Sequence, residues 1–160
     1  MMPSPPSIDR GRSSVYAAEL AAFEGTSYEA ITPFDELLVL GRLVTDAAWW
    51  PCGETEIVPA RVDACSSSTR RRGAAPPVVR LAADQMTPAT VLHELAHVLA
   101  GLDAGHGPSF RRAHLDLVGF AFGAEPAEWL DEAYRSMSLD VGHRRWARPS
   151  ERPGSGPIAL

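Results

Sequence analysis

Two histidines and a glutamate in the middle of the chain have the residue types and the spacing of a metal site. Residues 93–107 read HELAHVLAGLDAGHG, so His93, Glu94 and His97 form the pattern H-E-x-x-H. On a helix, residues four positions apart lie one turn apart, and both imidazoles can face one ion. A glutamate at this spacing can take a proton from a water that the ion activates and pass it to a leaving amine. The pattern therefore predicts two metal ligands with a general base beside them.

A third ligand must come from elsewhere, because catalytic zinc usually takes three protein ligands and leaves one position for water. His106 is the first candidate, since it follows a helix-ending glycine at Gly101 that lets the chain turn back. The flanking Gly105 and Gly107 would let the backbone approach the ion closely. A carboxylate ligand is the alternative, and one carboxylate could instead orient a histidine by accepting its second ring N–H. The carboxylates that come into question are Asp103, Asp116, Glu125 and Glu128.

The helix that carries the motif is predicted to begin after an N-cap at Thr87, with Pro88 in its first turn, and to run to about Ala100. On a helical wheel the two histidines lie almost opposite the apolar face. That face consists of Val91, Leu95, Val98 and Leu102, with Leu92 and Leu99 at its edge. Small residues beside the histidines are expected to leave room for a cleft; they are Ala89, Ala96 and Ala100.

Four other helices and two strands are expected to hold this helix in place. Apolar periodicity, with proline at helix starts and glycine at helix ends, predicts helices over residues 14–23, 33–50, 108–123 and 126–137. The second of these has Thr32 as its expected N-cap. Alternating residues predict strands over residues 56–64 and 78–82, joined by a flexible loop over 66–77. The expected fold class is α+β.

Length and charge limit the class of protein. A chain of 160 residues with 45% hydrophobic residues can form one domain with a real core, and its net charge of −5 gives no general attraction to nucleic acid or anionic membrane. No apolar run reaches the roughly 18 residues that would span a bilayer, and no secretory signal is apparent at the N-terminus. We expect a cytoplasmic protein in which Cys52 and Cys65 are unpaired thiols. Its parts would be a flexible N-terminus over 1–12, a domain over 13–141 and a disordered tail over 142–160.

The residues HELAH, a glycine-flanked loop and then HGPSF resemble the motif of the SprT-like zinc metallopeptidases, mainly over residues 78–120. The N-terminal RSSVYAAE is also similar to small predicted metallohydrolases of GC-rich bacteria and their phages, over about residues 9–140. The resemblance implies that His93, His97 and His106 bind the metal and that Glu94 is the general base. It also implies a minimal zincin fold, a small mixed sheet against the H-E-x-x-H helix, in which an extended substrate could pair with the strand at 78–82.

The expected function is therefore that of a zinc-dependent hydrolase, in particular a metallopeptidase acting on protein or peptide with one Zn²⁺ per chain. Two alternatives stay open: a non-catalytic module that zinc stabilises, and a nucleic-acid-associated SprT-like factor. The last would use short arginine clusters at 70–72 and 111–112 and in the tail. Nucleic acid is not expected as a partner, because the chain is acidic and lacks the paired cysteines of a zinc ribbon. A membrane is not expected either.

Several other residues are expected to be structural. His114 and His143 have no partner pattern and are predicted to lie on the surface. The adjacent tryptophans at the end of the second helix are predicted to be core anchors. Three further aromatic residues could line a cleft but are expected to serve packing. These five aromatic residues are Trp49, Trp50, Tyr28, Trp129 and Tyr134.

Overall fold

The computed structural model describes residue 9 and residues 11–69 and 75–150. In this part the chain forms a mixed α+β fold with five α-helices and a small mixed sheet, as expected, although the sheet has three strands and not two. None of the described helices has the length and apolar character needed to cross a membrane. The strands are β1 (Glu56–Pro59), β2 (Ser67–Thr69) and β3 (Val78–Leu81), and the helices are α1 (Arg12–Phe23), α2 (Phe34–Thr45), α3 (Pro88–Ala100), α4 (Pro108–Ala121) and α5 (Ala124–Ser136).

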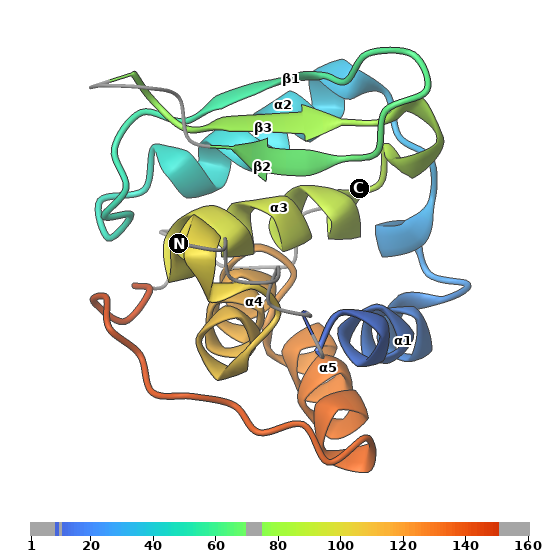
Figure 1. Ribbon diagram of the computed structural model, residues 1–160, viewed down its shortest axis with the longest axis vertical. Helices are drawn as coiled ribbons and strands as arrows, with labels where there is room; N and C mark the ends of the chain where they lie inside the picture. The colour runs from blue at the N-terminus through green and yellow to red at the C-terminus, as the bar shows by residue number, and fades with distance from the viewer. Residues whose placement is uncertain (1–8, 10, 70–74, 151–160) are drawn as a thin grey trace, which may run out of the picture.

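The sheet with α2 lies on one side of α3, and α1, α4 and α5 lie on the other (Figure 1). The strand order is β1–β3–β2, with β1 parallel and β2 antiparallel to β3. α2 lies behind the sheet and α3 runs along its β2 side, while α1, α4 and α5 lie beyond α3 (Figure 1). α3 packs on α4, and both α1 and α4 pack on α5. This central position explains why almost every residue of α3 is buried.

α2 ends at Thr45 and not at Trp50, and its N-cap is Pro33 and not Thr32. The Asp46 backbone N–H bonds back to the carbonyl of Arg42, and turns follow. Both tryptophans are 7% exposed, which confirms them as core residues. Adjacent side chains point about 100° apart on a helix, so a helix would not bury both on one face. The turns do.

The first predicted strand is shorter than expected, because β3 ends at Leu81 and offers β1 no partner beyond Ala60. Val62, expected to alternate inward, is 90% exposed. The predicted loop over 66–77 contains a strand, β2. Its serine-rich sequence lacks the usual strand signal, but its backbone pairs with β3, and the Ser66 hydroxyl accepts a hydrogen bond from the Ala82 backbone N–H at 2.9 Å.

Residues 144–146, expected to belong to a disordered tail, contact the domain. The Arg144 guanidinium binds both oxygens of Asp116, at 2.6 and 2.8 Å. The Trp146 indole N–H also donates to Asp116, at 2.9 Å. The arginine-rich composition of this segment does not predict these contacts. They depend on one buried carboxylate, that of Asp116, which can hold an arginine in place by two hydrogen bonds. Two smaller differences are that α1 begins at Arg12 and that α5 begins at Ala124, before Pro126.

Candidate metal centre

α3 is a capped helix whose histidine side is buried. Thr87 caps it as expected, since its Oγ1 accepts a hydrogen bond from the Thr90 backbone N–H at 3.2 Å. His93 is only 2% exposed, and its ring contacts Tyr16 of α1 and Phe110 of α4. The histidine side lies opposite the apolar face, as expected, but α1 and α4 cover His93. The small residues beside the histidines serve core packing and do not line a cleft; they are Ala89, Ala96 and Ala100.

His106 reaches the same place through a short turn. The chain leaves α3 at Gly101, with a φ of +99°, and passes the short 3-10 helix η3 (Leu102–Ala104) and Gly105, with a φ of +56°. The Nε2 atoms of His93 and His106 are 3.2 Å apart, and the rings of His97 and His106 are 4.6 Å apart, centre to centre. One ring nitrogen from each of the three histidines lies within 4.8 Å of the others, so the three could hold one metal ion.

Two carboxylates from the N-terminal part of the chain hold these rings. Glu19 Oε2 lies 2.9 Å from His93 Nδ1, and Asp9 Oδ2 lies 2.5 Å from His106 Nδ1. An ionised carboxylate only accepts, so each Nδ1–H donates and each Nε2 keeps its lone pair. The two Nε2 atoms then face each other at 3.2 Å, a spacing that needs either a proton or a metal ion between them. The donor set therefore has the chemistry of a cation site.

Neither supporting carboxylate was among those considered from the sequence, because 74 and 97 positions separate them from their histidines. A signal for Glu19 was present. It lies four residues after Val15 and four before Phe23, so a carboxylate sits on the apolar face of α1. No comparable pattern marks Asp9. Gly105, expected to approach the ion, lies beside Asp9 instead, and its φ of +56° is the reason for a glycine, since a Cβ there would only come into ordinary contact with the Asp9 carboxylate.

Glu19 also connects the site to a row of buried polar side chains, His114 and Tyr134. His114, expected on the surface, is fully buried and shares a 2.7 Å hydrogen bond between its Nδ1 and the Tyr134 hydroxyl. Its Nε2 lies 3.5 Å from Glu19 Oε1, an electrostatic contact and not an aligned hydrogen bond. No local pattern marks this role, because the partners of His114 come from two other helices. The buried row fixes Glu19 behind His93. His143 is exposed, as expected.

The charges around the histidines separate their protonation states. Burial alone would lower the pKa of His93, but the Glu19 carboxylate raises it above its ordinary value. Burial and the neighbouring His93 and His106 lower the pKa of His97 to about 3. Burial also lowers the pKa of His106, against the opposing hydrogen bond from Asp9. His97 and His106 are thus neutral donors near pH 7, and only His93 favours a proton when no cation is bound.

Glu94 lies on the other side of the motif, with its own hydrogen-bond partner. It is 4% exposed, and the Ser68 Oγ lies 2.7 Å from its Oε2 and 2.8 Å from its backbone oxygen. Burial raises the pKa of Glu94, although the charge of His93 and the Ser68 hydrogen bond oppose this. A raised pKa suits a carboxylate that must accept a proton near neutral pH. Ser68 belongs to β2, the strand that the sequence did not predict.

A cleft of about 560 Å³ reaches His93 and Glu94, whereas His97 and His106 are not among the described residues that line it. It runs between α1 and the segments before β2 and α3, and its floor is the first half of α3. His93 and Glu94 are part of its wall. The other described residues that line it are Arg12, Tyr16, Glu19, Leu20, Glu29, Ile31, Cys65, Ser66, Asp84, Gln85, Thr87 and Thr90. The buried motif is therefore reachable from one direction.

The carboxylates considered as alternative ligands lie away from the histidines. Asp116 is engaged by Arg144, and the other three, Asp103, Glu125 and Glu128, are exposed. A second group in the described residues, Glu19, His93 and His114, could also bring three donor atoms together. We favour the three histidines, because Glu19 is already occupied by His93 Nδ1 while two Nε2 lone pairs are free. The four carboxylates considered from the sequence do not orient a histidine ring either. Asp9 and Glu19 have that role.

The arginines considered for nucleic acid are mostly occupied. Arg111 is 6% exposed and donates to the backbone oxygens of His106 and Asp140, at 2.8 and 2.6 Å. Arg112 donates to the Gly142 backbone oxygen at 2.9 Å. The cluster at 70–72 lies outside the described residues. In the described part of the chain, these side chains hold the ligand loop and the C-terminal segment.

Three other expectations have clear outcomes. β3 is the central strand, paired on both sides, so it cannot take up a substrate strand; β2 is the edge strand beside α3. Cys52 and Cys65 are free thiols, as expected. Tyr134 is fully buried and Tyr28 stacks on Phe122 with ring centres 4.0 Å apart, which confirms both as packing residues. Neither they nor the partly exposed Trp129 line the cleft.

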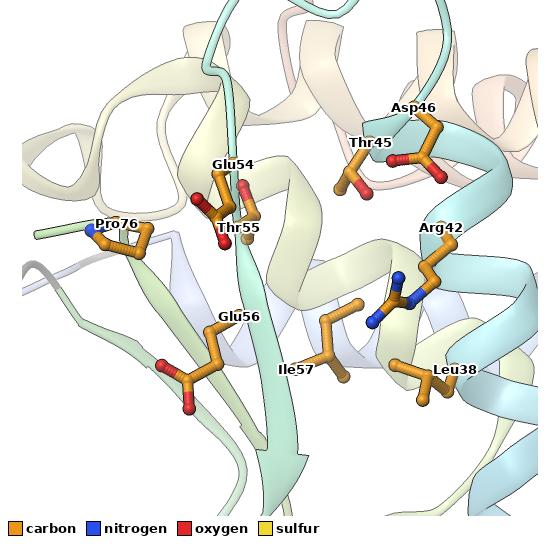
Figure 2. Close-up of a pocket in the computed structure, with 9 residues that line it drawn as sticks. All are labelled: Leu38, Arg42, Thr45, Asp46, Glu54, Thr55, Glu56, Ile57 and Pro76. Carbon is orange, nitrogen blue, oxygen red and sulfur yellow. The ribbon is translucent and has the colours of Figure 1, made fainter.

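A smaller cavity of about 240 Å³ lies between α2 and β1 (Figure 2). Arg42 and Leu38 of α2 and Ile57 of β1 point toward one another there (Figure 2). It contains none of the histidines. We therefore place the candidate chemistry in the larger cleft.

Comparison with protein-family models, with curated proteins and with solved structures found no match. The site must therefore be judged on its own chemistry.

Proposed function

We propose that this chain is a zinc-dependent hydrolase of zincin type, in particular a metallopeptidase that cleaves peptide bonds. One observation carries the proposal: the Nε2 atoms of His93 and His106 face each other, 3.2 Å apart, with carboxylates behind both rings. Two nitrogens at about 2.0–2.1 Å from a tetrahedral zinc ion are about 3.3 Å apart. The spacing fits two ligands of one ion, with His97 as the third.

The donor set favours zinc over the hard cations. Three neutral imidazoles suit zinc, whereas calcium and magnesium prefer oxygen ligands. The carboxylates of Asp9 and Glu19 accept the second ring N–H of two ligands, an arrangement that fixes the ring orientation and raises ligand basicity. Three protein ligands leave a fourth position, which is typical of catalytic and not of structural zinc.

Glu94 would carry the proton transfers. When bound, zinc supplies a Lewis acid that lowers the pKa of water toward about 7. The Glu94 carboxylate would accept the proton of that water and then give it to the leaving amine. The Ser68 hydroxyl, 2.7 Å from Glu94 Oε2, orients the carboxylate. Burial, which raises the pKa of Glu94, makes it a stronger base than an exposed glutamate.

The test of this role is Glu94→Gln, measured on hydrolysis of an unfolded, fluorescently labelled protein with zinc supplied. We expect the rate to fall by about 10²–10⁴-fold, the usual contribution of a general base, while the zinc content stays that of wild type. The matched control is Glu128→Gln, an exposed glutamate on α5, which should keep full activity. Full activity of Glu94→Gln with its metal retained would refute the mechanism.

A non-catalytic zinc-stabilised module is the alternative that an observation favours, because both His93 and His106 are nearly buried. In that case zinc would hold the loop between α3 and α4 against α3, and Glu94 would be incidental. Chelation would lower the thermal stability in either case. Only the hydrolase loses an activity when Glu94 is replaced, so the same variant separates the two functions.

A further inference from the structure

The cleft beside His93 gathers half of the large exposed hydrophobic side chains of the described residues. The described residues include six large hydrophobic side chains that are exposed, and three of them, Tyr16, Leu20 and Ile31, line this one cleft at 41%, 52% and 65% exposure. Concentrated exposed apolar surface in a concave site is typical of ligand binding. The other three exposed side chains, Val39, Val62 and Trp129, do not line it.

The cleft is also acidic. Its described lining contains four carboxylates and one guanidinium, that of Arg12. Two of the carboxylates, Glu19 and Glu94, are engaged by His93 and Ser68. The other two, Glu29 and Asp84, have no hydrogen bond or ion pair from any described side chain. Burial and the charge of Glu19 raise the pKa of Glu29 to about 7, and a cation beside it would stabilise its ionised form.

These features lie within one short cleft. Tyr16 stacks on His93, with ring centres 4.9 Å apart, so it lies at the reactive end. The Thr32 backbone N–H bonds to the Met86 carbonyl at 2.8 Å, which brings Ile31 to the beginning of α3, where Asp84 also lies, while the charges of Glu19 and His93 both act on the pKa of Glu29. The part of α3 that lines the cleft, with its cap, extends from Thr87 to Glu94, which is seven residues or about 10 Å along the helix axis. That length matches about three residues of an extended chain.

We propose that this cleft binds an extended peptide segment that carries a large apolar side chain and, within about three residues of it, a lysine or arginine. The apolar side chain would pack on Leu20 and Ile31, and the cation would be attracted by Glu29 and Asp84. This deepens the proposed function and rests on it. A cleft of about 560 Å³ has the size of a site for a few side chains.

The test measures binding without turnover, by fluorescence anisotropy of labelled peptides on zinc-loaded Glu94→Gln protein. The reference peptide carries leucine, serine and arginine in a glycine-serine background; the two others have serine for leucine, or glutamate for arginine. We expect each change to weaken binding by about tenfold. Ile31→Ser should abolish the preference for leucine, and Glu29→Gln with Asp84→Asn should abolish the preference for arginine.

Matched controls on α2 are Val39→Ser, an exposed apolar residue, and Asp35→Asn, an exposed carboxylate; both should keep the two preferences. Equal binding of all peptides, no binding, or preferences that survive the cleft variants would overturn the inference. Hydrolysis by the wild type is a separate measurement. Selective binding without any cleavage would count against the proposed activity but not against the cleft, and cleavage without selectivity would do the reverse.

Discussion

The candidate metal centre is built from two regions that differ in how they can be found. The first, from His93 to His106, is one continuous stretch that supplies all three imidazoles and Glu94. The second, Asp9 and Glu19, lies 97 and 74 positions before the histidines that it supports. A motif fixes ligand types, but the supporting region fixes which nitrogen of each ring carries the lone pair. The comparison shows that the ligands and their orientation have separate origins in the sequence.

The two supports also differ from each other. The Glu19 side chain is 8% exposed and connected to His114, whereas the Asp9 side chain is 34% exposed. His97 has no such support among the described residues and contacts the rings of His93, His106 and Phe110. A buried hydrogen bond loses more when its partner is removed than an exposed one does. The supports are therefore expected to rank in the order of their burial.

The largest effect should follow removal of the buried support. Glu19→Gln should weaken zinc binding by about 10–100-fold, the usual cost of losing a partner behind a histidine ligand. Asp9→Asn should cost less, because water can replace a half-exposed partner. Competition with a chromophoric chelator measures both affinities. An exposed glutamate on α1, Glu24→Gln, is the control. Equal, negligible losses in both variants would show that the N-terminal region does not support the metal.

A second effect concerns pH. Without metal, Glu19 raises the pKa of His93, while burial lowers the pKa of His106 and, with its charged neighbours, lowers that of His97 to about 3. Near pH 6, His93 alone should therefore be protonated, and binding of one zinc should release about one proton. Affinity should fall as pH drops through the raised pKa of His93. Calorimetry in two buffers of different ionisation enthalpy measures the release. About three protons per zinc would contradict this electrostatic picture.

The smallest effect should come from β2. The hydrogen bond from Ser68 lowers the pKa of Glu94. Ser68→Ala removes this hydrogen bond, so the pKa of Glu94 should rise. The acid limb of the pH–rate profile should move to higher pH by up to about one unit, because a hydrogen bond contributes roughly 0.5–1.5 kcal/mol. Zinc content should not change. Ser67→Ala, on the same strand, is the control. An unmoved acid limb would mean that Ser68 only holds the backbone of α3.

The same contrast explains how far the sequence could lead. α3, its Thr87 cap and its end at Gly101 follow from local signals, and the structure has them where they were predicted. β2 depends on pairing with β3 and not on its own residues, so no local pattern announced it. His114 was misplaced because its partners, Glu19 and Tyr134, come from two other helices. Tertiary contacts of this kind leave no periodic trace, except where a polar residue such as Glu19 interrupts an apolar face.

The central claim is that three histidines hold one zinc ion, and metal content tests it most directly. Mass spectrometry of protein purified without added zinc should compare the wild type with His106→Ala, and with His143→Ala as an exposed control. We expect about one zinc per chain in the wild type and in the control, and little or none in His106→Ala. If the wild type holds no zinc even after zinc is supplied, H-E-x-x-H is only part of a buried helix face, and the hydrolase proposal fails.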